Sequence, residues 1–184
     1  MIIGQLAGSG MVDADKTVVV GKHAGYSNMT SNADGTICIG YYAGNAITAS
    51  THGDENVVIG YESGLAITIG DGNTAVGTKS LTTEVGGNRS TAVGFHALRL
   101  QTNAGDADVY NVAIGYEAGD TLTSAAQCVI IGGQAGSGVM TADNNTLVGF
   151  QSGKAITSGA NNVAIGANAA DELVSGEKNV AIGV

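Results

Sequence analysis

One short pattern recurs along this chain and constrains its fold more than any other feature. The segment NVAIGYEAG at 111–119 returns as NVVIGYESG at 56–64 and as NVAIG at 162–166 and 179–183. A glycine follows each apolar triplet at successive steps of 17, 19, 20, 17, 17, 21, 17, 17, 17 and 17 residues. Such a period is typical of a solenoid, whose units bury their apolar faces only by stacking. We call these glycines the anchors: Gly4, Gly21, Gly40, Gly60, Gly77, Gly94, Gly115, Gly132, Gly149, Gly166 and Gly183.

Composition narrows the class of protein. Of the 184 residues, 30 are Gly, 43% are apolar and only 12% are charged, which argues against disorder and for many unusual backbone angles. The formal net charge of −9 disfavours binding to nucleic acid. No apolar run is long enough for a transmembrane helix, so no membrane insertion is expected. Because both ends lie in the repeat register, we expect residues 1–184 to be a single repeat array within a longer fibre.

The three residues before each anchor are expected to form a β-strand. The residue next to the anchor is Ile or Val in every coil, and it shares a face with the residue two positions earlier. The residue between them is also apolar and often Ala, so both faces are apolar, as in covered parallel sheets. The sequence thus predicts an all-β fold: a parallel β-solenoid or β-roll of about ten 17-residue coils, roughly 50 Å long.

The second apolar face of these strands needs a partner. We expect the Ile and Val face to fill the coil and the face of small residues to contact identical chains, which supply matching surfaces. The protein is therefore expected to be a homo-oligomer. The interface candidates are Ala75, Ala92, Ala113, Ala164 and Ala181.

The residues after the anchor are expected to turn the chain. Three after it, only Ala or Ser occurs, which indicates tight packing. Four after it, Gly predominates and indicates a positive φ, whereas Leu81, Leu98 and Ala170 indicate an altered geometry in their coils. Further apolar pairs are expected to form a second, shorter strand that closes the coil, at 47–48, 67–68, 122–123, 156–157 and 173–174.

Asparagine recurs four residues before the anchor. Stacked once per coil, these side chains are expected to bond to one another and to turn backbone, rather than to bear glycans or bind metal. The expected ladder consists of Asn56, Asn73, Asn111, Asn145, Asn162 and Asn179.

The units NVAIGYEAG and NTAVGTKSL, the latter at 73–81, resemble two related groups of repeats. One is the head of trimeric autotransporter adhesins (YadA-like), built from SVAIG-type units. The other is the NTAVG repeat arrays of phage tail fibres and other virion fibres. The resemblance covers the whole chain and implies a left-handed β-roll and a homotrimer. The 17-residue period is longer than that usual in adhesin heads, and three insertions interrupt it.

No pattern points to catalysis or to a cofactor. His23 and His96 share a register position that other coils fill with varied polar residues, which is typical of a solvated face. The segments 71–73 and 105–108 hint at Ca²⁺, but they do not repeat between coils and are interpreted as turns. Cys38 and Cys128 are expected to be small buried residues. We therefore expect no enzyme activity and no cofactor.

The three long steps are the irregularities of the chain. They place extra residues around 26–34, 49–55 and 101–110, and insertions on one side of a solenoid are commonly its binding face, although loops that bind nothing fit equally. Aromatic residues directly after the anchors are interpreted as a shield of the coil edge rather than a sugar-stacking stripe. The receptor-loop candidates are Tyr26, Asn28, His52, Asp54, Asp106, Asp108 and Tyr110.

These observations favour a non-enzymatic structural and host-adhesion segment of a phage tail fibre or other virion appendage. Its expected partners are two further copies of itself and a glycan or protein of the host surface. The head of a bacterial trimeric adhesin, on the cell surface, is the second hypothesis. A monomeric ice- or carbohydrate-binding solenoid ranks last, because its threonines are not continuous over neighbouring coils.

Overall fold

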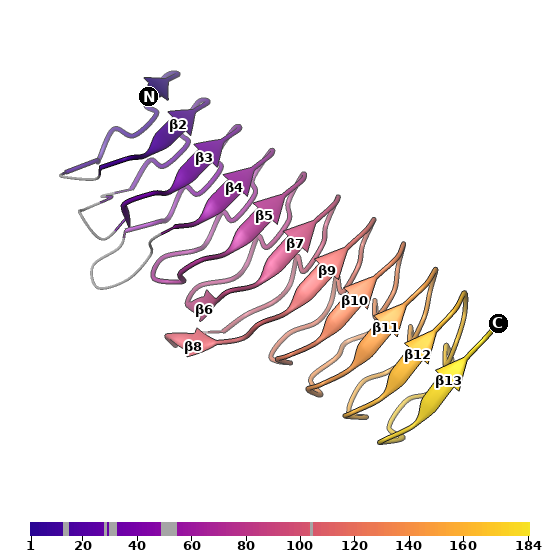
Figure 1. Cartoon of the computed structure of the whole chain (residues 1–184). Helices are drawn as coiled ribbons and strands as arrows, with labels where there is room; N and C mark the ends of the chain where they lie inside the picture. Colours follow the sequence, from indigo (N-terminus) through magenta and orange to yellow (C-terminus); the bar gives the residue numbers. More distant parts are fainter. Residues whose placement is uncertain (13–14, 28, 30–32, 49–54, 104) are drawn as a thin grey trace.

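The chain folds into a parallel β-solenoid of about ten coils, which confirms the predicted fold class. The computed structural model describes residues 1–12, 15–27, 29, 33–48, 55–103 and 105–184, and no α-helix occurs among them. Figure 1 shows the coils stacked along one axis, with the two termini at opposite ends.

The strands lie where the sequence places them, directly before the anchors. Among the described residues, eleven of them form one parallel sheet, in which strands of successive coils pair at equal register positions, for example Val112 with Val129. A separate two-stranded parallel sheet joins β6 (Gly87–Asn88) and β8 (Ala107–Asp108). The main sheet contains β1 (Ile2–Ile3), β2 (Val18–Val20), β3 (Ile37–Ile39), β4 (Val57–Ile59), β5 (Thr74–Val76), β7 (Thr91–Val93), β9 (Val112–Ile114), β10 (Val129–Ile131), β11 (Thr146–Val148), β12 (Val163–Ile165) and β13 (Val180–Ile182).

The middle residue of each inner strand points into its own coil, so the predicted assignment of the two sheet faces is wrong. Nine middle residues are fully buried: Val19, Cys38, Val58, Ala75, Ala92, Ala113, Ile130, Leu147 and Ala164. The flanking Ile, Val and Thr residues face outward and are only partly covered. The coil interior also holds the Ala or Ser row and an apolar residue from the far turn, so this single row of strand side chains, from Ala to Ile130 and Leu147, completes the core.

The second strand predicted to close the coil is absent from the described residues. Ile47, Ile67, Leu122 and Ile156 are fully buried and complete the core, but they lie in turns and irregular backbone. Neighbouring coils are joined there by isolated hydrogen bonds, such as Thr123 N to Met140 O at 3.1 Å. Left-handed backbone positions on both sides of this segment leave too few extended residues for a ladder.

The anchor glycines stack directly on one another. Gly94 has a φ of 136°, and a Cβ added to it would collide with the carbonyl oxygen of Gly115, the next anchor. The same collision with the following anchor recurs from Gly4 to Gly166. Glycine is therefore required here by the coil spacing as well as by the backbone angle.

The position four after the anchor keeps a left-handed backbone in every coil, whatever its residue. Leu81, Leu98 and Ala170 have φ values of 49°, 48° and 55°, close to those of the glycines that they replace. The expectation that these coils change geometry is therefore wrong. The stacked neighbours fix the backbone path, and burial of a leucine, worth about 1.5–3 kcal/mol, offsets a strain of similar size.

Each rung of the asparagine ladder joins its coil to the next. Asn73 Oδ1 accepts a hydrogen bond from Ser90 N at 2.9 Å, and Asn73 Nδ2 donates to Gly87 O at 2.8 Å. Equivalent pairs of bonds to backbone are made by Asn56, Asn111, Asn145 and Asn162. Direct bonds between asparagines occur only toward the C-terminal end of the described ladder, where Asn179 Nδ2 donates to Asn162 Oδ1 at 3.0 Å.

Replacing an inner anchor should disrupt the stack. We expect Gly94→Ala to lower the stability of the solenoid by about 2–5 kcal/mol, because it adds strain at a positive φ to a steric collision. Chemical unfolding followed by circular dichroism measures the loss. Gly105→Ala is the control, since a Cβ at Gly105 meets no atom within 4 Å. Equal stability of the two variants would contradict the proposed role of the anchors.

Removing one rung of the ladder should also be costly. Asn73→Ala leaves the Ser90 amide and the Gly87 carbonyl without their buried partner, which costs about 2–4 kcal/mol. The matched control is Asn179→Ala, at the same register position but exposed in the last coil. Thermal unfolding of both variants tests this, and the inner change is expected to lower the midpoint more.

Candidate functional site

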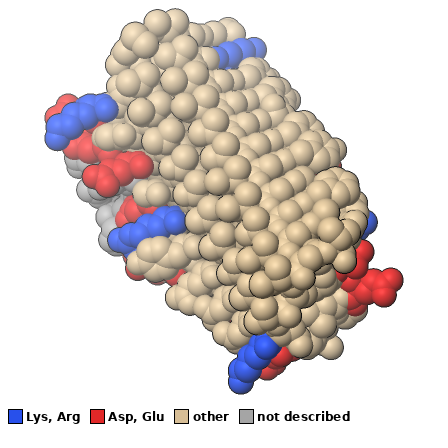
Figure 2. Space-filling view, turned by 45° about the vertical axis from the view of Figure 1, so that its right-hand side comes forward, with Lys and Arg blue, Asp and Glu red and all other residues tan. Residues whose placement is uncertain are grey.

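The outward side of the main sheet is an uncharged surface defined by the repeat. We call it the outer sheet face, and it consists of the residues one and three before each anchor. No Asp, Glu, Lys or Arg occupies any of these positions. Ile114 and Ile131, paired across β9 and β10, are 41% and 36% exposed. Figure 2 shows a broad ridged surface without charged side chains, with charges confined to its margins.

Aromatic rings directly after the anchors contact one another from coil to coil. The rings of Tyr41 and Tyr61 lie 5.4 Å apart at 12°, and those of Phe95 and Tyr116 lie 5.5 Å apart at 7°. Nearly parallel rings at this separation partly cover each other's faces. This pairing along the coil edge fits the interpretation that the rings shield it, and the four rings are 40–54% exposed.

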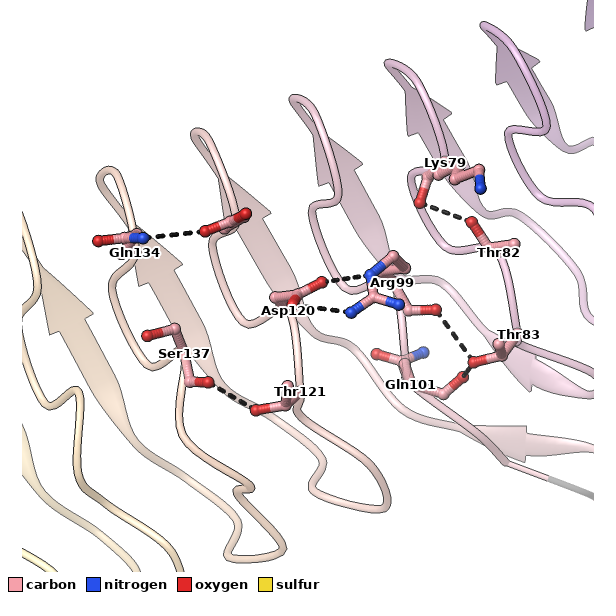
Figure 3. A network of polar contacts seen from close by, with 10 residues as sticks. Lys79, Thr82, Thr83, Arg99, Gln101, Asp120, Thr121, Gln134 and Ser137 are labelled. Carbon is pink, nitrogen blue, oxygen red and sulfur yellow. Dashed lines mark hydrogen bonds and ion pairs between the residues drawn. The ribbon is translucent and has the colours of Figure 1, made fainter.

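Polar side chains on the turns bridge neighbouring coils (Figure 3). Arg99 donates two hydrogen bonds to Asp120, at 2.7 and 3.0 Å. Gln134 Nε2 donates to Glu117 Oε2 at 2.9 Å, and this bond is the main cause of the lowered pKa of Glu117. These contacts hold the turns in fixed positions along the coil edge.

The longest insertion builds a polar hollow on the surface. Its residues come from three consecutive coils, because β6 and β8 lie side by side and Asn88 pairs with Asp108. The hollow has a volume of about 400 Å³, and it is lined by Asp71, Asn88, Arg89, Asp106 and Asp108. Tyr110 lies beside it, with its hydroxyl donating to Asp108 Oδ2 at 2.9 Å.

Asn88 organises the hollow from below. Only 5% of it is exposed, and its Nδ2 donates to Asp106 Oδ1 at 2.7 Å while its Oδ1 accepts from Asp71 N at 2.9 Å. Arg89 forms an ion pair with Asp108, and its guanidinium lies 5.8 Å from the Tyr110 ring centroid. The hollow therefore combines carboxylate acceptors with amide and guanidinium donors in a fixed arrangement.

A buried carboxylate anchors the insertion that forms this hollow. Glu84 is fully buried, and its Oε1 accepts backbone hydrogen bonds from Val85, Gly86, Gly87 and Asn103 at 2.8–3.2 Å. Its Oε2 accepts from Gln101 Nε2 at 2.7 Å and from Asn103 Nδ2 at 3.0 Å. Six donors thus compensate for burial of the charge and hold the start of the insertion against the preceding coil.

Glu84 and Gln101 stand where other coils have a buried Ile or Leu, and the sequence analysis did not single them out. The signal that marks them is a paired change. In the coil of Gly60, a Cβ at Gly64 would lie 2.9 Å from Ile67 Cδ1, so glycine leaves space for the isoleucine. Where Leu81 and Leu98 replace that glycine and are themselves buried, the residue three positions later is polar.

The structure brings three of the predicted receptor-loop residues together. Asp106, Asp108 and Tyr110 gather at the hollow, joined by Asp71, Asn88 and Arg89, which were not among the predicted candidates. Tyr26 lies apart from them, exposed and 5.2 Å from the His23 ring. The remaining candidates, Asn28, His52 and Asp54, lie outside the described residues.

The interface candidates Ala75, Ala92, Ala113 and Ala164 are enclosed within one chain, which corrects their assignment to contacts between chains. Ala181, in the coil of β13, is partly exposed. On a single chain, the outer sheet face is the side of the strands that stays partly exposed.

Other reactive groups have ordinary structural surroundings. Burial raises the pKa of Cys38 to about 12 and that of Cys128 to about 11, so both thiols stay protonated at neutral pH. His96 stacks on Phe95, and burial followed by the nearby Arg99 lowers its pKa. Within the described part of the chain, no group of three His, Cys, Asp or Glu side chains is placed to hold a metal, and no helix could cross a membrane.

Comparisons with protein-family models, with curated proteins and with solved structures find no match to this chain.

The role of Glu84 in holding the insertion against the preceding coil can be tested by substitution. Glu84→Gln turns one acceptor oxygen into a donor that faces other donors, so we expect a loss of about 3 kcal/mol. Backbone amides of residues 103 and 105–110 should exchange hydrogen faster. The double variant Leu81→Gly with Glu84→Ile restores the core pattern of other coils but lacks the hydrogen bonds that Glu84 makes to the insertion, so it too should show faster exchange there. Slow exchange of the insertion in both variants would contradict this role.

Proposed function

We propose that this chain is a rigid, non-enzymatic segment of a homotrimeric fibre that displays loops to a host surface, as in a phage tail fibre or similar virion appendage. The observation on which this rests is the outer sheet face, a continuous uncharged surface that a single chain leaves partly exposed. The virion setting, the trimer and the left-handed winding draw on the resemblance to fibre and adhesin-head repeats.

The size of the outer sheet face supports assembly. Eleven strands spaced about 4.8 Å apart and about three residues long give a plan area of roughly 500 Å². Patches of this size on soluble proteins commonly mark interaction sites. Covering branched residues such as Ile114 and Ile131 would add about 25 cal/mol of stabilisation for each Å² of apolar surface removed from water.

An identical chain matches this face better than an unrelated partner does. The ridges of the face repeat once per coil, and a second copy offers ridges of the same spacing, so the two surfaces can interdigitate along their whole length. The face is only one short strand wide, so three copies can meet around a common axis. The charges of the chain would then lie on the outside, where they remain solvated.

The turns and insertions remain free in this arrangement. The polar hollow and its neighbouring turns belong to other sides of the coil than the outer sheet face. A trimer would therefore present three copies of each insertion, and weak contacts with a surface would add through multivalency. Such multivalent display supports an adhesive role for the insertions, while the coil core serves only to hold them in place.

Association through the outer sheet face makes a direct prediction. Light scattering coupled to chromatography should give three chains per particle for the natural sequence. The pair Ile114→Glu with Ile131→Lys should give monomers, because it places charges in the interface while the two new side chains can pair across β9 and β10.

The control is Val139→Glu, which adds a charge at an exposed residue outside the strands. This variant should remain trimeric, and circular dichroism should show that both variants keep the fold. A natural chain that is a stable monomer, or a trimer unaffected by the paired change, would contradict the proposal.

A further inference from the structure

The hollow beside β6 and β8 differs from the rest of the repeat surface. It exists because the insertion before Gly115 adds β8, which pairs with β6 and places Asp108 next to Asn88. Its lining is almost entirely polar, with carboxylates, a carboxamide and a guanidinium around a volume of about 400 Å³. A pocket of this size holds a small ligand.

The charges of the lining limit the ligand class. Three carboxylates outnumber one guanidinium, so a phosphate, sulfate or acidic sugar would meet net repulsion. A metal ion is disfavoured by Arg89, whose guanidinium is paired with Asp108, and the described residues offer no cluster suited to a metal. A neutral ligand that both donates and accepts hydrogen bonds fits this mixture best.

We propose that this hollow binds a neutral sugar residue of a surface glycan. Vicinal hydroxyls can donate to the carboxylates of Asp106 and Asp108, which are strong acceptors, and can accept from the Arg89 guanidinium. Tyr110, 46% exposed at the rim, provides an aromatic group for contact with sugar C–H groups.

Asn88, in the floor of the hollow, and Glu84, behind the insertion, hold this site in place. Asn88 donates to Asp106 and, at a longer 3.5 Å, to Asp108, so it fixes the carboxylates relative to each other. Glu84 holds Asn103 at the start of the insertion. The ligand thus meets groups already held in place, which lowers the entropy cost of binding.

This inference rests on the proposed adhesive function, and it is tested by binding on the whole chain. The neutral probes are glucose, galactose, mannose and N-acetylglucosamine, compared with sialic acid, glucose 6-phosphate, spermidine and Ca²⁺. Saturation-transfer NMR detects binding and calorimetry measures affinity. We expect at least one neutral sugar to bind, and the near-isosteric pair Asp106→Asn with Asp108→Asn to weaken it about tenfold or more.

Asp143→Asn is the matched control, because Asp143 lies on an equivalent turn and accepts from Ala126 N as a surface residue. It should leave sugar affinity unchanged. Binding of none of the neutral sugars, preference for an acidic sugar, spermidine or Ca²⁺, or an unchanged affinity in the double variant would each overturn the inference. A trimer that binds no sugar overturns this inference alone, whereas a monomer that binds sugar overturns only the proposed assembly.

Discussion

The close approach of successive anchor glycines is the constraint on which the rest of the structure depends. Each anchor lies against the carbonyl of the next, so the coils stack at a spacing that excludes a Cβ. This contact repeats at equal register and brings the strands into one parallel sheet. The asparagine ladder strengthens the same contact between coils, because each rung satisfies one amide and one carbonyl of the following coil. The coil spacing also forces left-handed angles onto leucines and other residues that rarely adopt them.

With the backbone path fixed, variation is confined to exchanges of side-chain volume inside the coil. Glycine with isoleucine three positions later is one solution, and leucine with a polar residue is the other. The second solution admits Glu84 and Gln101 to the interior, where Gln101 donates to Glu84 and Glu84 also accepts from Asn103. Because Glu84 bonds to Asn103 at the start of the longest insertion, this core substitution and the insertion that forms the polar hollow are in contact.

A single chain buries the apolar side chains inside its coils but leaves those on the outer sheet face partly exposed. The middle residues of the inner strands are fully enclosed, whereas Ile114 and Ile131 on the outer sheet face keep more than a third of their surface exposed. The hydrophobic effect favours covering such a surface, and the charges of this acidic chain lie elsewhere. The structure thus separates an uncharged sheet side from polar turns and insertions, and the proposed assembly and adhesion rest on this separation.

The sequence by itself determined the period, the strand positions, the asparagine ladder and the need for glycine at the anchors, because each depends on local residue preferences repeated in register. It could not determine which strand face is interior, since both faces are apolar and the answer depends on how much volume the far turn contributes. Nor could it show that a second strand is missing or that Leu81 keeps a left-handed angle, because neighbouring coils impose both. The hollow also needed the tertiary structure: Asp71, Asn88 and Asp108 belong to different coils, and only stacking brings them together.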